Sequence, residues 1–60
     1  MTTFYIIDTK INEIINAVEA TSLERAQTVI DGMIAPQDLL VTAVPPLAML
    51  QRYRYWDERP

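Results

Sequence analysis

One segment, residues 22–34, carries the strongest structural signal in the chain, an amphipathic helix with a defined beginning and end. Ser22 is suited to cap this helix because its hydroxyl can accept a hydrogen bond from a free backbone N–H. The negative charge of Glu24, in the first turn, interacts favourably with the positive end of the helix dipole. Gly32 can adopt the left-handed conformation that ends a helix, and Pro36 prevents the helix from continuing. A helix is therefore predicted over residues 22–34.

One side of this predicted helix is apolar and needs a covering layer. Its apolar residues recur at spacings of three and four, which aligns them along a helix of 3.6 residues per turn: Leu23, Ala26, Val29, Ile30 and Met33. A chain of 60 residues is short enough to form one domain over residues 1–60, with the remaining segments packed on that side.

The residues before the helix predict a β-hairpin over residues 3–20. Residues 3–8 are rich in the β-branched and aromatic side chains that strands favour. A helix is the alternative for residues 11–20, because four apolar residues there also have helical spacing. The hairpin is favoured because Asp8 commonly opens a turn and Asn12 tolerates the left-handed conformation that a short hairpin loop requires.

The residues after the helix predict a third strand and a tail. The strand over residues 38–44 is almost continuously apolar, which indicates either cover on both faces or partial exposure at a contact. Pro45 and Pro46 end it because neither can donate to a strand ladder. The tail, residues 46–60, is predicted as a short helix with Pro46 at its first position, and an extended tail is the alternative.

Together these segments predict an α+β fold. It is a small β-β-α-β domain in which one antiparallel-type sheet packs on a single helix, followed by a C-terminal short helix or extended tail.

The residue types that catalysis and metal binding need are scarce. The chain has no His and no Cys, its one Ser is the predicted helix cap, and its one Lys, Lys10, falls in a predicted turn. Nucleophilic catalysis, a metal site and a cofactor site are therefore not expected. A single Gly excludes a glycine-rich phosphate loop, and the dispersed acids fit solvated positions better than a catalytic pair. We expect a protein that is not an enzyme.

Composition also bears on the compartment. The longest apolar run is far shorter than the roughly 20 residues that a membrane helix needs, and the first residues do not resemble a signal peptide. The lack of Cys fits a reducing compartment. A cytoplasmic protein without membrane contact is the expectation.

The tail contains the one motif that suggests binding. Guanidinium groups alternate with aromatic rings, a combination typical of protein interfaces and of stacking on bases: Arg52, Tyr53, Arg54, Tyr55 and Trp56. These five residues are the predicted partner-binding site. In the alternative interpretation, Tyr53 and Trp56 close a small core while the arginines stay solvated or pair with nearby acids. Nucleic acid ranks last as a partner because the net charge is −3.

The apolar excess favours binding as the function. Half of the residues are apolar and only 22% are charged. A domain this small has too little interior to bury all of these apolar side chains. We expect a non-enzymatic protein-interaction module. One alternative is a small structural subunit or homodimer that pairs through the tail or through strand 38–44 as an exposed sheet edge. A nucleic-acid-binding regulator is the other.

The segment from Asn16 to Ala26, Asn-Ala-Val-Glu-Ala-Thr-Ser-Leu-Glu-Arg-Ala, runs from a strand directly into the capped helix. It resembles a junction in small β-β-α-β proteins and is similar to one in a short phage inhibitor of bacterial RNA polymerase and, more loosely, in antitoxins of the HicB kind. The resemblance carries over no functional residue, and the chain lacks the DNA-binding helix of the antitoxins. It implies an accessory or anti-defence protein of a phage or other mobile element, which binds and blocks a host protein complex.

Overall fold

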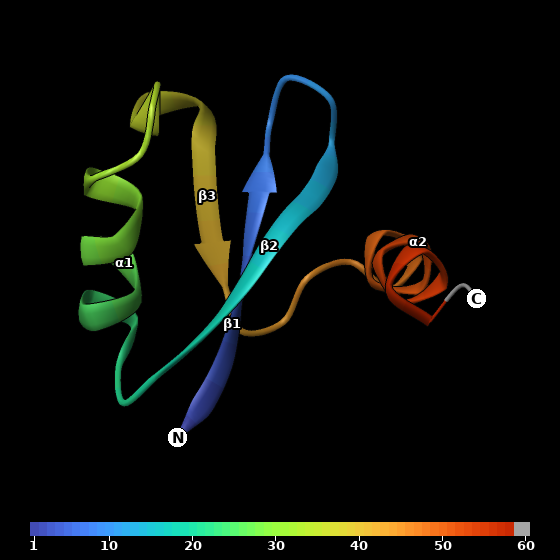
Figure 1. Ribbon diagram of the computed structural model, residues 1–60, viewed down its shortest axis with the longest axis horizontal. Helices are drawn as coiled ribbons and strands as arrows, with labels where there is room; N and C mark the ends of the chain where they lie inside the picture. Colours follow the sequence, from blue (N-terminus) through green and yellow to red (C-terminus); the bar gives the residue numbers. More distant parts are fainter. Residues whose placement is uncertain (59–60) are drawn as a thin grey trace.

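The computed structural model describes the backbone of residues 1–58 and the side chains of residues 1–54. The elements in chain order are two strands, a helix, a short 3-10 helix, a third strand and a second helix (Figure 1): β1 (Thr2–Asp8), β2 (Glu13–Ala20), α1 (Leu23–Asp31), η1 (Pro36–Asp38), β3 (Leu39–Thr42) and α2 (Leu47–Glu58). The predicted α+β fold class is confirmed.

The sheet has three strands in the order β2-β1-β3, and both neighbouring pairs are antiparallel. The predicted hairpin is confirmed over the helical alternative. Asp8 opens its loop by accepting a hydrogen bond from the Lys10 N–H at 2.9 Å, and Asn12 adopts a left-handed φ of 55°. The register of β2 slips by one residue opposite Ile6 and Ile7, so that Ile15 forms a bulge.

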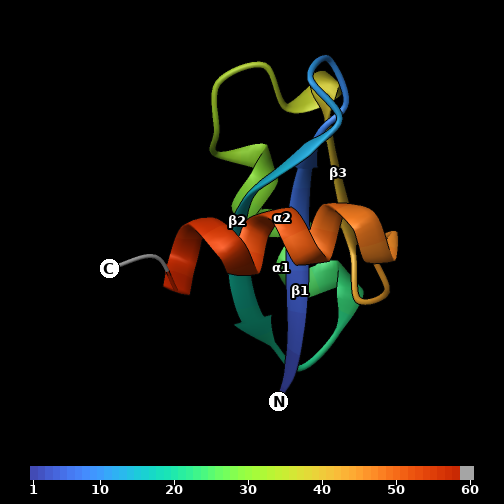
Figure 2. The same cartoon turned by 90° about the vertical axis from the view of Figure 1, so that its right-hand side faces the viewer.

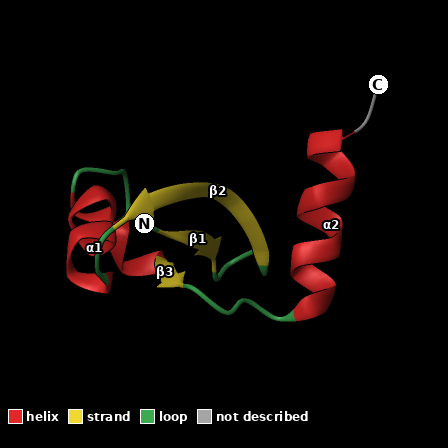
Figure 3. Cartoon of the chain, turned by 90° about the horizontal axis from the view of Figure 1, so that it is seen from below, coloured by secondary structure: helices red, strands yellow, loops and turns green. Residues whose placement is uncertain are grey.

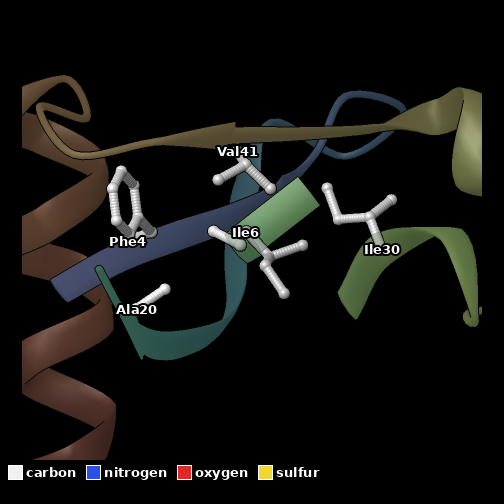
Figure 4. Close-up of a cluster of buried hydrophobic side chains, with 6 residues drawn as sticks. Phe4, Ile6, Ala20, Ile30 and Val41 are labelled. Atoms are coloured by element: carbon white, nitrogen blue, oxygen red, sulfur yellow. The ribbon is translucent and has the colours of Figure 1, made fainter. Parts of the chain in front are cut away.

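One face of the sheet packs on α1. Alternate residues of each strand point to this face, where they meet two residues of the helix and form one hydrophobic cluster (Figure 4): Phe4, Ile6, Ala20, Ala26, Ile30 and Val41. Ile7 and Ile14 are also buried, outside this cluster. Ile6 and Ile30 are fully buried. This cluster is the main apolar contact that holds the sheet and α1 together.

The start of α1 confirms the sequence analysis, whereas its end does not. Ser22 caps the helix by accepting from the Arg25 N–H. The helix ends at Asp31, short of the predicted range, and Gly32 has a φ of −91° instead of the expected left-handed value. The left-handed residue is Ala35, with a φ of 54° directly before η1. A glycine permits the left-handed conformation without requiring it, and here the chain turns three residues later.

The predicted apolar side of α1 is only partly buried. Ala26 and Ile30 are covered by the sheet, but Leu23 is 52% exposed and Val29 is 44% exposed. At 100° per residue, Leu23 and Val29 lie about 60° to either side of Ala26. Val29 is about 100° around the helix from the fully buried Ile30, at the margin of the covered face. Leu23 is only about 20° from Ile30, so its exposure reflects its place as the first residue of the helix.

The third strand is shorter than predicted. It covers Leu39–Thr42, because Asp38 belongs to η1 and residues 43 and 44 bend away from the sheet. Val41 points into the core while Leu40 lies on the opposite face and is 52% exposed. Of the two explanations offered for the apolar run, partial exposure at the surface is the one that the fold shows.

The tail is helical, as predicted, but the helix begins after Pro46. The Pro46 carbonyl accepts the first helical hydrogen bond from the Leu50 N–H at 3.0 Å. Figures 2 and 3 show α2 lying across the face of the sheet that α1 does not cover, with its beginning on the β3 side. The sheet therefore lies between two helices. Neither helix within residues 1–58 is long and apolar enough to cross a membrane.

Candidate protein-interaction surface

Two contacts with the hairpin orient α2 on the sheet. Arg52 donates from Nε to Glu13 Oε1 at 2.7 Å and from Nη2 to the Asn12 carbonyl at 3.2 Å. Tyr53 packs edge-on against Tyr5, with the ring centroids 6.1 Å apart and the planes at 82°. The inner side of α2 is therefore fixed by one polar contact at the hairpin loop and one aromatic contact at β1.

The polar contact adds little to the stability of the domain, but it helps to orient α2 on the sheet. The side chains of Arg52 and Glu13 are 46% and 37% exposed, and ion pairs this open to water contribute only about 0.2–1 kcal/mol. The Tyr5–Tyr53 contact has the edge-to-face geometry that aromatic pairs prefer. Because the two contacts lie on adjacent residues of one helical turn, they fix which side of α2 faces outward.

These contacts divide the predicted site. Arg52 and Tyr53 are turned toward the hairpin, whereas Arg54 is exposed. The backbone of Tyr55 and Trp56 is part of α2, and their side chains are outside the part of the chain whose side chains are described. The structure thus brings two of the five residues against the sheet and leaves one of them on the outer side of the helix.

The outer side of α2 begins with apolar residues that the sequence analysis did not single out. Leu47 is 69% exposed, and Gln51 and Arg54 follow it at spacings of four and three, also exposed. Val44, in the segment that leads from β3 to α2, is 85% exposed. We call these four residues the linker–α2 surface: Val44, Leu47, Gln51 and Arg54.

The sequence contained a partial signal for this surface. The predicted third strand, residues 38–44, includes Val44, and the predicted tail, residues 46–60, includes Leu47. Pro45 and Pro46 separate the end of the strand from the helix, and residues 43–46 consequently leave the sheet. Val44 directly precedes the two prolines, beyond the last residue of β3, and therefore does not pair with a neighbouring strand.

Within residues 1–54, whose side chains are described, the surface has no pocket and no group of three potential metal ligands. Each buried side-chain nitrogen or oxygen in that range has a hydrogen-bond partner. Comparisons with protein-family models, with curated proteins and with solved structures give no match.

Proposed function

We propose that this domain is a non-enzymatic protein-interaction module that binds another protein through the linker–α2 surface. The observation that carries the proposal is the exposure of Val44 and Leu47, at 85% and 69%, together with the exposed Arg54, which lies about two turns further along the same side of α2 as Leu47. Large apolar side chains next to an arginine match the composition of protein interfaces, which combine apolar anchors with arginine.

The orientation of α2 supports this proposal. The contacts of Arg52 and Tyr53 hold the inner side of the helix on the hairpin, so the outer side is already positioned before a partner arrives. A surface positioned in advance loses less conformational entropy when it binds.

Charge argues for a protein partner over a nucleic acid. Arg52 is engaged with Glu13, which leaves Arg54 as the one basic side chain of the linker–α2 surface, in a chain of net charge −3. Nucleic-acid binding depends on neutralising several phosphates with Lys or Arg. Blockage of a host protein complex by a mobile-element protein stays a prediction from the sequence.

Matched variants test the proposal. Leu47 and Leu23 are the first residues of α2 and α1 and are both exposed, so Leu47→Asp and Leu23→Asp make the same change at equivalent positions. Arg54→Glu and Arg25→Glu form a second pair of exposed arginines. Tagged protein is incubated with extract of the cells that naturally produce it, and captured proteins are quantified by mass spectrometry.

We expect a protein captured in near-equal amount by the original chain and by the α1 variants. Leu47→Asp and Arg54→Glu should reduce its capture at least about tenfold, as loss of a central interface residue does. Circular dichroism should be unchanged in all four variants. Equal capture by both members of each pair would contradict the proposal, and so would turnover of any substrate.

A further inference from the structure

We propose that two copies of this chain pair through the outer edge of β3, so that their sheets join into one antiparallel sheet of six strands. The pairing would involve the backbone and side chains of residues 39–43. It does not rest on the proposed function, because the linker–α2 surface consists of other residues, on α2 and in the segment before it. The outer edge of β3 is free, carries no charge and can pair with itself.

The register of the β1–β3 pair determines which backbone groups of β3 are free. The Thr9 N–H donates to the Asp38 carbonyl at 2.9 Å, at the start of this pair. In antiparallel strands, hydrogen-bonded pairs alternate with non-bonded pairs, so Leu40 and Thr42 direct their backbone groups to β1. Val41, between them, directs its N–H and carbonyl away from β1. No other strand among the described residues pairs with this side of β3.

The two edges of the sheet differ in charge and regularity. The outer strand β2 carries Glu13 and Glu19 and is interrupted by the bulge at Ile15, and charges and bulges are devices that prevent edge pairing. Residues 39–44 contain no charged side chain. The acid next to them, Asp38, is paired with Lys10 at 3.3 Å.

This difference selects a second copy as the occupant of the β3 edge. The chain has a net charge of −3, so two copies repel each other wherever their acids meet. The strand β3, residues 39–42, is an uncharged edge where two identical chains can approach without placing like charges opposite one another. The β2 edge instead carries Glu19, in addition to the Glu13 that is paired with Arg52, and it is interrupted by the bulge.

The edge is also self-complementary. When a two-fold axis passes midway between the Val41 residues of two copies, the N–H of each Val41 can donate to the Val41 carbonyl of the other copy. Leu40 then lies opposite Thr42 of the second copy, and the two Leu40 side chains become diagonal neighbours on the same face. The half-exposed Leu40 would gain a partly apolar neighbour there.

The same symmetry fixes where the helices go. In one chain, α1 and α2 lie on opposite faces of the sheet, with β3 at an edge (Figure 3). A two-fold axis perpendicular to the sheet keeps each face on its own side. Both copies of α2 would therefore lie on one face of the six-stranded sheet, and both copies of α1 on the other.

Charge-swap variants at Leu40 test the pairing. Leu40→Lys and Leu40→Glu each place like charges at diagonal positions in the dimer, whereas a mixture of the two places opposite charges there. Leu23→Lys is the control, because Leu23 has the same exposed fraction of 52% but lies on α1. Sedimentation equilibrium measures the dimer dissociation constant of each sample.

The original chain and Leu23→Lys should form the same dimer. Each Leu40 variant alone should weaken it at least about tenfold, and the mixture should restore at least part of that loss. A monomeric original chain overturns the proposal, and so does a dimer whose dissociation constant in both Leu40 variants equals that of the original chain.

A measurement on the original chain covers the case in which a Leu40 variant does not fold. In a sample that mixes isotope-labelled and unlabelled chains, the Leu40 Hα and the Thr42 Hα of the second copy should give an intermolecular nuclear Overhauser effect. These residues form a non-bonded pair, in which the Cα atoms approach to about 4.5 Å. Lack of this signal in a sample that sedimentation shows to be dimeric would also overturn the proposal.

Discussion

The two faces of the sheet are covered by helices in different ways. On the α1 face, apolar side chains of the strands meet Ala26 and Ile30, and the contact excludes water. On the α2 face, the strand residues Ile7 and Ile14 are also buried, but α2 itself supplies no fully buried side chain among residues 47–54. The specific contacts of this helix are the partly exposed Arg52–Glu13 ion pair and the Tyr5–Tyr53 ring contact. The difference indicates that α1 supplies buried side chains to the core, whereas α2 is attached by partly exposed contacts and its outer side, at Leu47, Gln51 and Arg54, is exposed.

The strongest test of this contrast is a charge in the α1 face. Ile30 is fully buried, so Ile30→Asp places a carboxylate in the core without a partner. The cost of several kcal/mol exceeds or equals a stability of roughly 5 kcal/mol for so small a domain. The variant should show no cooperative thermal transition by circular dichroism, while Leu47→Asp on α2 should melt like the original chain. A folded Ile30→Asp protein would contradict the role given to α1.

A smaller loss is expected when the aromatic contact on the α2 face is removed. Tyr53→Ala deletes the edge-to-face pairing with Tyr5 and part of the apolar cover of the sheet, so the free energy of unfolding should fall by about 1–2 kcal/mol. Gln51→Ala, on the outer side of the same helix, is the control and should change little. Urea titration compares the two. If Tyr53→Ala unfolds the domain, the α2 face is as essential as the α1 face.

The ion pair at the hairpin loop should matter less than the ring contact. A double-mutant cycle with Arg52→Ala and Glu13→Ala should give a coupling free energy below about 1 kcal/mol, because both side chains are partly solvated. The coupling should shrink further in high salt. A coupling that exceeds this value and resists salt would show that α2 is bound more tightly than its exposure suggests.

The smallest effect is expected at the end of α1, and it has the opposite sign. Gly32 has an ordinary φ of −91°, and a Cβ atom placed there would approach only the Val29 carbonyl oxygen, at 3.8 Å. Gly32→Ala should therefore leave the stability unchanged or raise it by about half a kcal/mol, because the unfolded chain loses entropy. Destabilisation in urea titration would support the left-handed conformation that the sequence suggested.

The elements that the sequence predicted correctly are those set by local chemistry. Ser22 caps α1 through a bond that spans three residues, and the Asp8 and Asn12 turn is complete within five residues. Such interactions form wherever the right side chains are close in sequence. The hairpin and the start of α1 could therefore be predicted before any tertiary contact was known.

The placement of α2 could not be predicted in that way. Arg52 and Glu13 are 39 residues apart, and nothing near Arg52 in the sequence indicates that partner. The sequence allowed for partial exposure of residues 38–44 but did not show which side chains are exposed, because an apolar side chain does not reveal whether the fold has enough surface to cover it. Of the proposed linker–α2 surface, the sequence analysis predicted Arg54 as a binding residue but not Leu47, which is exposed where the chain leaves the sheet.

Native-state hydrogen exchange tests the contrast between the two faces most directly. Amide protons of β1 and α1 should exchange only through global unfolding, whereas those of the first turns of α2 should exchange through a local opening of distinctly lower free energy. That result would show α2 as an attachment that can detach while the α1 face stays closed. Equal opening free energies for Ile6, Ile30 and Tyr53 would contradict it, because α2 would then belong to the same cooperative core.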